Sequence, residues 1–168
     1  MALDATIGGA TANSYVTVAE ASAYFANRLH GDAWSASTNQ YEAEALITAS
    51  QQLDWYITWK GTKASVTQAL DWPRTGVLDD LGVDEYASTV LPAKLKVAVF
   101  ELALSSLATD RTNDPSLAGI SEIRAGSLQI KADDGVYTST PSAIPDKVRK
   151  ILKGLSVRSG NSVRLIRA

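Results

Sequence analysis

The fold of this chain is decided by residues 45–77, which have the sequence ALITASQQLDWYITWKGTKASVTQALDWPRTGV. Apolar residues at helical spacing run through this stretch as far as Trp59, and Gly61 follows, so a long helix is predicted over residues 39–59. Trp72 precedes a proline, which disfavours helical backbone at Trp72 and predicts a turn there. The chain is therefore expected to leave an aromatic helix end and fold back on itself.

Local signals predict two further long helices. Thr17 and Glu20 have the spacing of a capping box, in which a hydroxyl and a carboxylate satisfy the free amides of a helix start. A first helix is therefore expected to follow Thr17 and to end near residue 29, with a polar linker over residues 34–38 after it. Pro92 suits the first turn of a third helix reaching about residue 109, whose apolar residues cover nearly its whole circumference. This third helix should be the central one.

The C-terminal third of the chain has a different pattern. Apolar and polar residues alternate over about residues 120–131, which predicts a short β-hairpin. Pro145 predicts the start of a fourth helix that ends near residue 155. The predicted fold class is therefore mainly α: a small bundle of about four helices with one β-hairpin and an extended C-terminal tail.

The two ends of the chain differ in composition from its body. Residues 1–14 are small and Gly-rich and are expected to form a flexible arm on a domain of residues 1–155. Residues 156–168 are expected to form an extended basic tail. From residue 145 onward seven Lys and Arg stand against one acidic residue, whereas the rest carries nine basic and seventeen acidic residues. A tail of opposite charge to the body predicts docking on an acidic surface.

Composition also limits the class of protein. The chain has 168 residues, of which 45% are hydrophobic and 20% charged, which suits one globular domain. It has no Cys, which excludes disulfides and fits a reducing compartment. The N-terminus lacks the basic start and apolar core of a signal peptide, and the longest apolar segment is shorter than the roughly 20 residues of a membrane span. We expect a soluble protein that is cytoplasmic when made, with no membrane partner.

The sequence contains no recognisable catalytic or metal-binding pattern. His30 is the single histidine, and it stands at a predicted helix end without the partners of a catalytic triad. The acidic residues in 79–85 lack the alternating ligands and closing Glu of a calcium loop, so a solvated loop is the favoured interpretation. Residues 61–63 lack the upstream glycine and strand of a phosphate-binding loop. We expect no enzyme, no metal and no cofactor.

One group of residues suggests nucleic-acid binding. Trp55, Tyr56 and Trp59 stand beside Lys60 and Lys63 and would form a stacking platform with flanking cations. The acidic body opposes binding to a phosphate backbone. Burial in the core or in a subunit interface is the favoured interpretation of these aromatic residues.

Several motifs resemble those of a family of tailed-bacteriophage proteins. They are Asn13-Ser14-Tyr15-Val16, QALDWPRTGV at 68–77, LPAKLK at 91–96, the Glu101-Leu102-Ala103 helix, the hairpin and the helix after Pro145. The resemblance covers nearly the whole chain, and the Trp-Pro-Arg turn is its most specific part. Members of this family are labelled DnaT-like single-stranded-DNA-binding proteins, and they look like head–tail connector subunits, also called adaptor or head-completion proteins.

The resemblance implies a structural virion protein of the neck. It implies a homo-oligomeric ring, commonly dodecameric, beneath a portal protein and above a tail-side neck or tail-terminator protein. Genomic double-stranded DNA would pass through the lumen without specific binding. Two alternatives stay open: a single-stranded-DNA-binding module of replication, and another neck protein such as a tail terminator.

The connector hypothesis assigns roles to two groups of residues. The tail would dock on the portal through Arg158, Val163, Arg164, Leu165, Ile166 and Arg167. A structural corner or subunit interface would be formed by Trp55, Trp59, Trp72, Pro73 and Arg74. For Arg74, a salt bridge within the subunit is weighed against one to a neighbour's acidic loop at Asp79 and Asp80.

Overall fold

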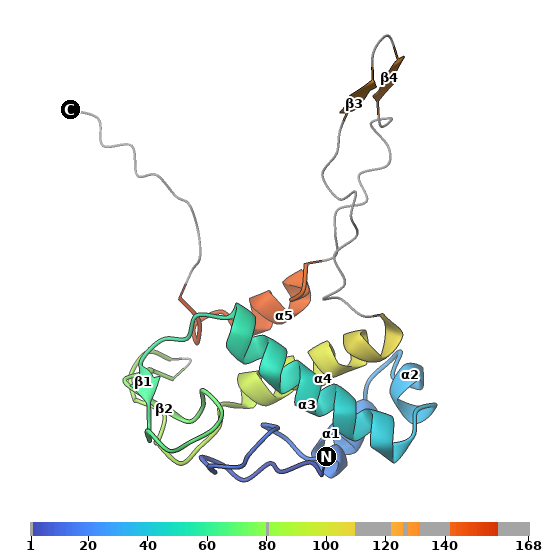
Figure 1. Ribbon diagram of the computed structural model, residues 1–168. Helices are drawn as coiled ribbons and strands as arrows, with labels where there is room; N and C mark the ends of the chain where they lie inside the picture. Colours follow the sequence, from blue (N-terminus) through green and yellow to red (C-terminus); the bar gives the residue numbers. More distant parts are fainter. Residues whose placement is uncertain (1, 80, 110–121, 126–127, 132–141, 158–168) are drawn as a thin grey trace, which may run out of the picture.

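The computed structural model describes residues 2–79, 81–109 and 142–157, together with the backbone of two short strands. It is mainly helical, which confirms the predicted fold class (Figure 1). The described helices are α1 (Val18–Phe25), α2 (Asp32–Ser35), α3 (Asn39–Tyr56), α4 (Ala93–Ala108) and α5 (Asp146–Ile151). The described strands are β1 (Thr62–Lys63), β2 (Arg74–Thr75), β3 (Glu122–Ala125) and β4 (Leu128–Lys131).

The core forms where α3 lies across α4 (Figure 1). Leu46 and Leu53 of α3, and Leu95 and Leu102 of α4, have no exposed surface. Each such side chain contributes about 1.5 to 3 kcal/mol by leaving water. α4 also contacts α2 and α5, so it is the central helix, as predicted.

The N-terminal helix begins as predicted and ends earlier. In the capping box, Glu20 Oε2 accepts from Thr17 N at 2.8 Å, and Thr17 Oγ1 accepts from Glu20 N at 3.2 Å. α1 stops at Phe25, and the short helix α2 overlaps the start of the linker expected over residues 34–38. Its Trp34 is buried and stacks on Phe25 with ring centroids 4.8 Å apart. This contact between segments nine residues apart explains why the linker is helical.

The segment expected to be a flexible arm forms a hydrogen-bonded loop over residues 2–14. Asp4 N donates to Asn13 Oδ1 at 2.8 Å, and Thr11 Oγ1 donates to Asp4 Oδ2 at 2.8 Å. Asn13 Nδ2 donates in turn to the carbonyl of Ala2 at 2.9 Å. Ser14, at the end of the loop, is fully buried against the helices.

The chain leaves α3 three residues earlier than predicted. Ile57 has extended backbone angles, φ −111° and ψ 124°, so residues 57–60 form an extended segment. β1 and β2 then pair antiparallel, with Thr62 opposite Thr75. This pair closes the corner that residues 45–77 were expected to make, and the Trp72–Pro73 peptide bond within it is cis.

The C-terminal part of the described chain returns to this corner. After α5, Lys60 N donates to the carbonyl of Leu155 at 3.0 Å, and Val157 N donates to the carbonyl of Thr58 at 2.8 Å. β3 and β4 pair antiparallel within the predicted hairpin range. The predicted tail beyond residue 157 lies outside the described residues. In the part of the chain that the structure covers, none of the helices combines the length and apolar character of a membrane span.

Candidate functional site

An aromatic and basic surface lies at the C-terminal end of α3. Trp55 is 70% exposed and Tyr56 is 48% exposed, both in the last turn of the helix. Lys60 is exposed four residues further on. Val157 is 49% exposed on the paired C-terminal segment, where its backbone N donates to the carbonyl of Thr58. We call Trp55, Tyr56, Lys60 and Val157 the α3-end patch. It combines two exposed aromatic side chains with a cation that follows them closely in the chain.

The helix predicted over residues 39–59 would place Trp55 and Trp59, four residues apart, on one face, but the structure separates them. Trp59 is buried, with its indole edge-on to Trp72 at a centroid distance of 5.9 Å and an interplanar angle of 87°. The expectation was wrong because α3 ends at Tyr56, so Trp59 follows in extended backbone and turns inward. Trp55 therefore belongs to the surface and Trp59 to the core.

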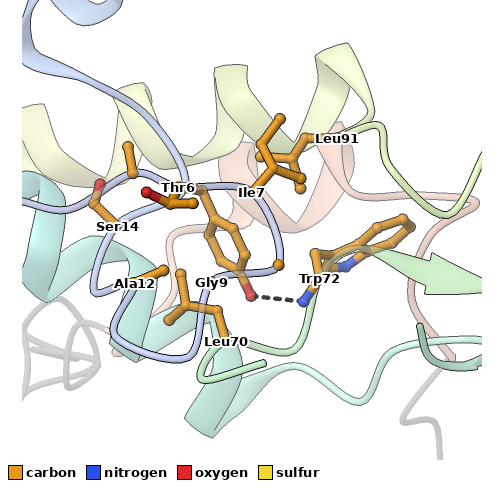
Figure 2. Close-up of a pocket in the computed structure, with 11 residues that line it drawn as sticks. Thr6, Ile7, Gly9, Ala12, Ser14, Leu70, Trp72 and Leu91 are labelled. Carbon is orange, nitrogen blue, oxygen red and sulfur yellow. Dashed lines mark hydrogen bonds between the residues drawn. The ribbon is translucent and has the colours of Figure 1, made fainter. Parts of the chain in front are cut away.

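A partly buried carboxylate, Asp54, lies at the base of the α3-end patch. Asp54 Oδ1 accepts hydrogen bonds from the Tyr15 hydroxyl and from Trp59 Nε1, and Asp54 Oδ2 accepts from Asp71 N at 3.0 Å. Trp72 N donates to the Tyr15 hydroxyl oxygen at 3.2 Å, drawn dashed in Figure 2. The network joins the N-terminal loop, α3 and the Trp-Pro-Arg turn, and it fixes where the helix end lies.

Burial changes the proton affinity of this network. Burial raises the pKa of Asp54 to about 6, and the hydrogen bonds that it accepts only partly offset this effect. Burial, together with the nearby Asp54 carboxylate, also raises the pKa of Tyr15 well above its usual value. This network was not predictable from local sequence patterns, because Asp71 and Tyr15 lie 17 and 39 residues from Asp54.

Arg74 binds backbone carbonyls rather than an acidic side chain. Its Nε donates to the carbonyl of Lys60 and its Nη2 to that of Gly61, both at 2.7 Å, and its Nη1 donates to the carbonyl of Asp71 at 3.2 Å. The guanidinium therefore ties the β1–β2 corner to the segment that carries Lys60. Among the described residues, no salt bridge joins Arg74 to Asp79, and Asp80 lies outside the described residues, so the bridge to Asp80 and the bridge to a neighbouring subunit stay predictions.

The remaining predicted site residues fall into two groups. Trp72 and Pro73 are buried, and Lys63 pairs with Asp71 at 3.0 Å. The proposed portal-docking residues lie outside the described residues: Arg158, Val163, Arg164, Leu165, Ile166 and Arg167. Further cations that are described and exposed stand on and after α5: Arg149, Lys150 and Lys153.

Two hollows in the described structure offer no better binding site than the α3-end patch. The one drawn in Figure 2, between the N-terminal loop, Leu70, Trp72 and Leu91, is too narrow to admit water. A wider groove of about 650 Å³ lies near the start of α3, where Tyr41, Glu44 and Leu107 are among its lining residues. Its one charged side chain is acidic, so it does not suit an anion. Within the described ranges, no three His, Asp or Glu side chains gather as a metal site would require.

The fold and its surface define a class: a small, mainly helical protein with two exposed aromatic side chains and a lysine at and after the end of α3. Over residues 1–168 the chain matches the family model described as "Putative DnaT-like ssDNA binding protein", and it belongs to that family. Comparison with curated proteins and with solved structures gives no match.

The family match corrects the function inferred from the sequence. The head–tail connector interpretation is wrong, because the family that covers the whole chain is described by single-stranded-DNA binding and not as a connector of the virion. The match favours the first alternative, single-stranded-DNA binding, and gives no support to a tail terminator. The portal and neck partners, the dodecameric ring, the DNA lumen and the place in the virion depended on the connector interpretation and gain no support from the match. The absence of enzymatic activity stays a prediction.

Proposed function

We propose that this protein binds single-stranded DNA through the α3-end patch, as a module of DNA replication. The observation that carries the proposal is the exposure of Trp55, an indole held 70% in solvent at a fixed helix end beside Tyr56 and Lys60. A large aromatic side chain with a cation next to it is the arrangement on which unpaired bases stack. The description of the family supports the same ligand.

The patch suits a single strand better than a duplex. Trp55 and Tyr56 offer aromatic faces, which need unstacked bases as partners, and a duplex keeps its base faces covered. Lys60 would neutralise a phosphate beside the stacked bases. Arg149, Lys150 and Lys153 stand close in sequence to the segment that pairs with residues 58–60, so further cations are available nearby. The acidic body confines the contact to this end of the molecule.

Substitution of Trp55 tests the proposal directly. We expect Trp55→Ala to weaken binding of a labelled oligothymidylate by roughly 5- to 150-fold in fluorescence anisotropy, because one stacked base contributes about 1 to 3 kcal/mol. Tyr41→Ala is the matched control: Tyr41 is 59% exposed near the other end of α3. Both side chains are largely in water, so circular dichroism should show an unchanged fold.

The salt dependence of binding provides a second readout. Each phosphate neutralised on a single strand contributes about −0.7 to the slope of log affinity against log salt. Lys60→Ala should therefore make the slope shallower by about 0.7. Equal losses for Trp55→Ala and Tyr41→Ala would count against the α3-end patch, and a wild-type protein that fails to bind the oligonucleotide would overturn the proposed function.

A further inference from the structure

A second exposed surface has the opposite charge to the α3-end patch. Leu78, Leu81 and Val83 are 50%, 83% and 72% exposed on the turn that follows β2. Asp84 and Glu85 are exposed next to them. We call the described residues of this turn, 78–79 and 81–85, the acidic–apolar loop. Single exposed apolar side chains are common, but three on one turn indicate a contact surface.

The acidic–apolar loop has a defined shape. Asp79 Oδ1 accepts from Leu81 N at 3.0 Å and from Val83 N at 3.1 Å, which closes the turn from within. Asp79 N donates to the carbonyl of Asp84 at 2.7 Å, and Leu78 pairs with Glu85 across the base. The apolar side chains are thus held outward by hydrogen bonds, so docking them would cost little ordering entropy.

The loop and the α3-end patch are chemically complementary. The loop offers apolar side chains flanked by Asp84 and Glu85, and the patch offers Trp55, Tyr56 and Val157 flanked by Lys60. Single-stranded DNA has the same features as the loop, since its bases are flat and weakly polar and its phosphates are anionic. A surface that suits one of these ligands suits the other.

We infer that the acidic–apolar loop of one copy docks on the α3-end patch of a second copy, and that single-stranded DNA displaces it. The inference rests on the proposed function, because the DNA and the loop share one surface. The loop does not cover the patch of its own chain, since both are exposed in the described structure. A second copy is therefore the occupant that this complementarity favours.

The contact would be head-to-tail and weak. The loop and the patch are different surfaces, so an assembly of copies keeps one free loop at one end and one free patch at the other, and a further copy can add at either end. A turn of this size buries much less than the roughly 1,200 Å² of a stable interface. We therefore expect self-association at high micromolar concentration, and we expect salt to weaken it.

Sedimentation velocity of the full chain without DNA tests the contact. We expect the wild type to sediment faster as its concentration rises from about 10 μM to about 1 mM, and we expect Leu81→Gln to abolish this rise. Leu29→Gln is the matched control, because Leu29 is 81% exposed after α1, away from the loop in sequence. A wild type that stays monomeric, or a Leu81→Gln variant that associates normally, overturns the inference.

Mixing two variants tests the head-to-tail arrangement. Leu81→Gln keeps a working patch and Trp55→Ala keeps a working loop, so neither should associate alone. Their mixture should form a one-to-one dimer that grows no further, because only one complementary pair of surfaces remains. A mixture that stays monomeric overturns the arrangement.

Adding oligothymidylate separates this inference from the proposed function. Saturating oligonucleotide should return the wild type to DNA-bound monomers. In Leu81→Gln no loop competes for the α3-end patch, so this variant should bind DNA at least as well as the wild type. DNA binding with no effect on self-association overturns the shared surface and keeps the proposed function. Self-association without any DNA binding overturns the proposed function and the displacement step, and keeps the contact between copies.

Discussion

At the scale of single residues, Asp54 shows how burial and hydrogen bonding oppose each other. Its carboxylate accepts from Tyr15, Trp59 and Asp71, and these bonds favour the ionised form. Burial favours the neutral form and is the larger effect, so the pKa rises to about 6. The residue that orders the base of the α3-end patch is therefore itself sensitive to pH.

The raised pKa of Asp54 predicts a pH dependence of stability with a definite sign. The folded protein holds a proton on Asp54 that the unfolded chain releases near pH 4, so this group stabilises the fold most in acid, and its contribution falls as pH rises through about 6. Between pH 4 and pH 7.5 the free energy of unfolding of the wild type should fall, relative to Asp54→Asn, by at most about 3 kcal/mol. Urea denaturation at several pH values measures this difference, and parallel profiles for the two proteins would contradict it.

The residue scale also marks a limit of prediction from sequence. The capping pair Thr17 and Glu20 was predictable because both partners lie within one helical turn. The exposure of Trp55 and the burial of Trp59 were not predictable, because they depend on where α3 ends. That end is set by contacts with Tyr15 and Asp71, which are distant in the chain.

At the scale of elements, the β1–β2 corner depends on Gly61. Its φ is +68°, and a Cβ there would lie 2.1 Å from the carbonyl oxygen of Thr75. Glycine is thus required both for the backbone conformation and for the close approach of the two strands. The same backbone carries Lys60 into the α3-end patch.

Two glycine substitutions separate conformation from crowding. Gly82 has a similar φ, +72°, but no atom within 4 Å of the position that a Cβ would occupy. Gly82→Ala should cost about 1 to 2 kcal/mol from the left-handed conformation alone. Gly61→Ala should cost more, about 3 kcal/mol or above, because backbone atoms must also move. Thermal unfolding of both variants measures the two losses, and similar losses would contradict the clash at Gly61.

The helices and strands that have a local signal in the sequence were predicted, and those that depend on distant contacts were not. α1 and α4 began where the capping box and Pro92 placed them. α2 was missed, because four residues carry too little periodicity and Trp34 is held by Phe25. The β1–β2 pair was also missed, because its two-residue strands are joined by a long turn.

At the scale of the whole molecule, Glu101 joins three helices. On α4, its carboxylate accepts from Arg28 Nε at 2.8 Å and Nη2 at 2.9 Å, from Tyr24 of α1 at 2.7 Å, and pairs with Lys147 of α5 at 2.8 Å. Burial alone would raise the pKa of Glu101, but these hydrogen bonds outweigh burial and lower it below the usual value. The ionised form is therefore the one that holds the bundle together.

Loss of the Glu101 charge should destabilise the whole bundle. Glu101→Gln leaves Arg28 and Lys147 without their carboxylate and should lower the free energy of unfolding at pH 7 by about 2 to 4 kcal/mol. Lys96→Gln breaks the more exposed pair with Glu20 and should cost about 0 to 1 kcal/mol.

The lowered pKa means that the contribution of Glu101 is present above about pH 4.5 and is lost in acid, so the difference between wild type and Glu101→Gln should shrink there. Equal losses for both variants at pH 7 would contradict this role.

Function was the least predictable property at this scale. An acidic body with a basic end is compatible with a connector and with a protein that binds DNA at one end, so charge alone did not separate the two. The family match separates them, and the exposure of Trp55 and Tyr56 next to a buried Trp59 supports the proposed DNA contact. The spacing of apolar residues cannot predict which of these side chains is exposed, because it assigns residues to the faces of a helix only as far as the helix extends.

The burial of the tryptophans gives the protein two optical reporters. Trp34, Trp59 and Trp72 are at most 5% exposed, whereas Trp55 is 70% exposed. The three buried indoles emit at shorter wavelength and change when the core opens, whereas emission from Trp55 is open to acrylamide quenching and changes when a ligand covers it. A single unlabelled sample thus reports occupancy of the α3-end patch at the red edge of its emission and the integrity of the fold at the blue edge.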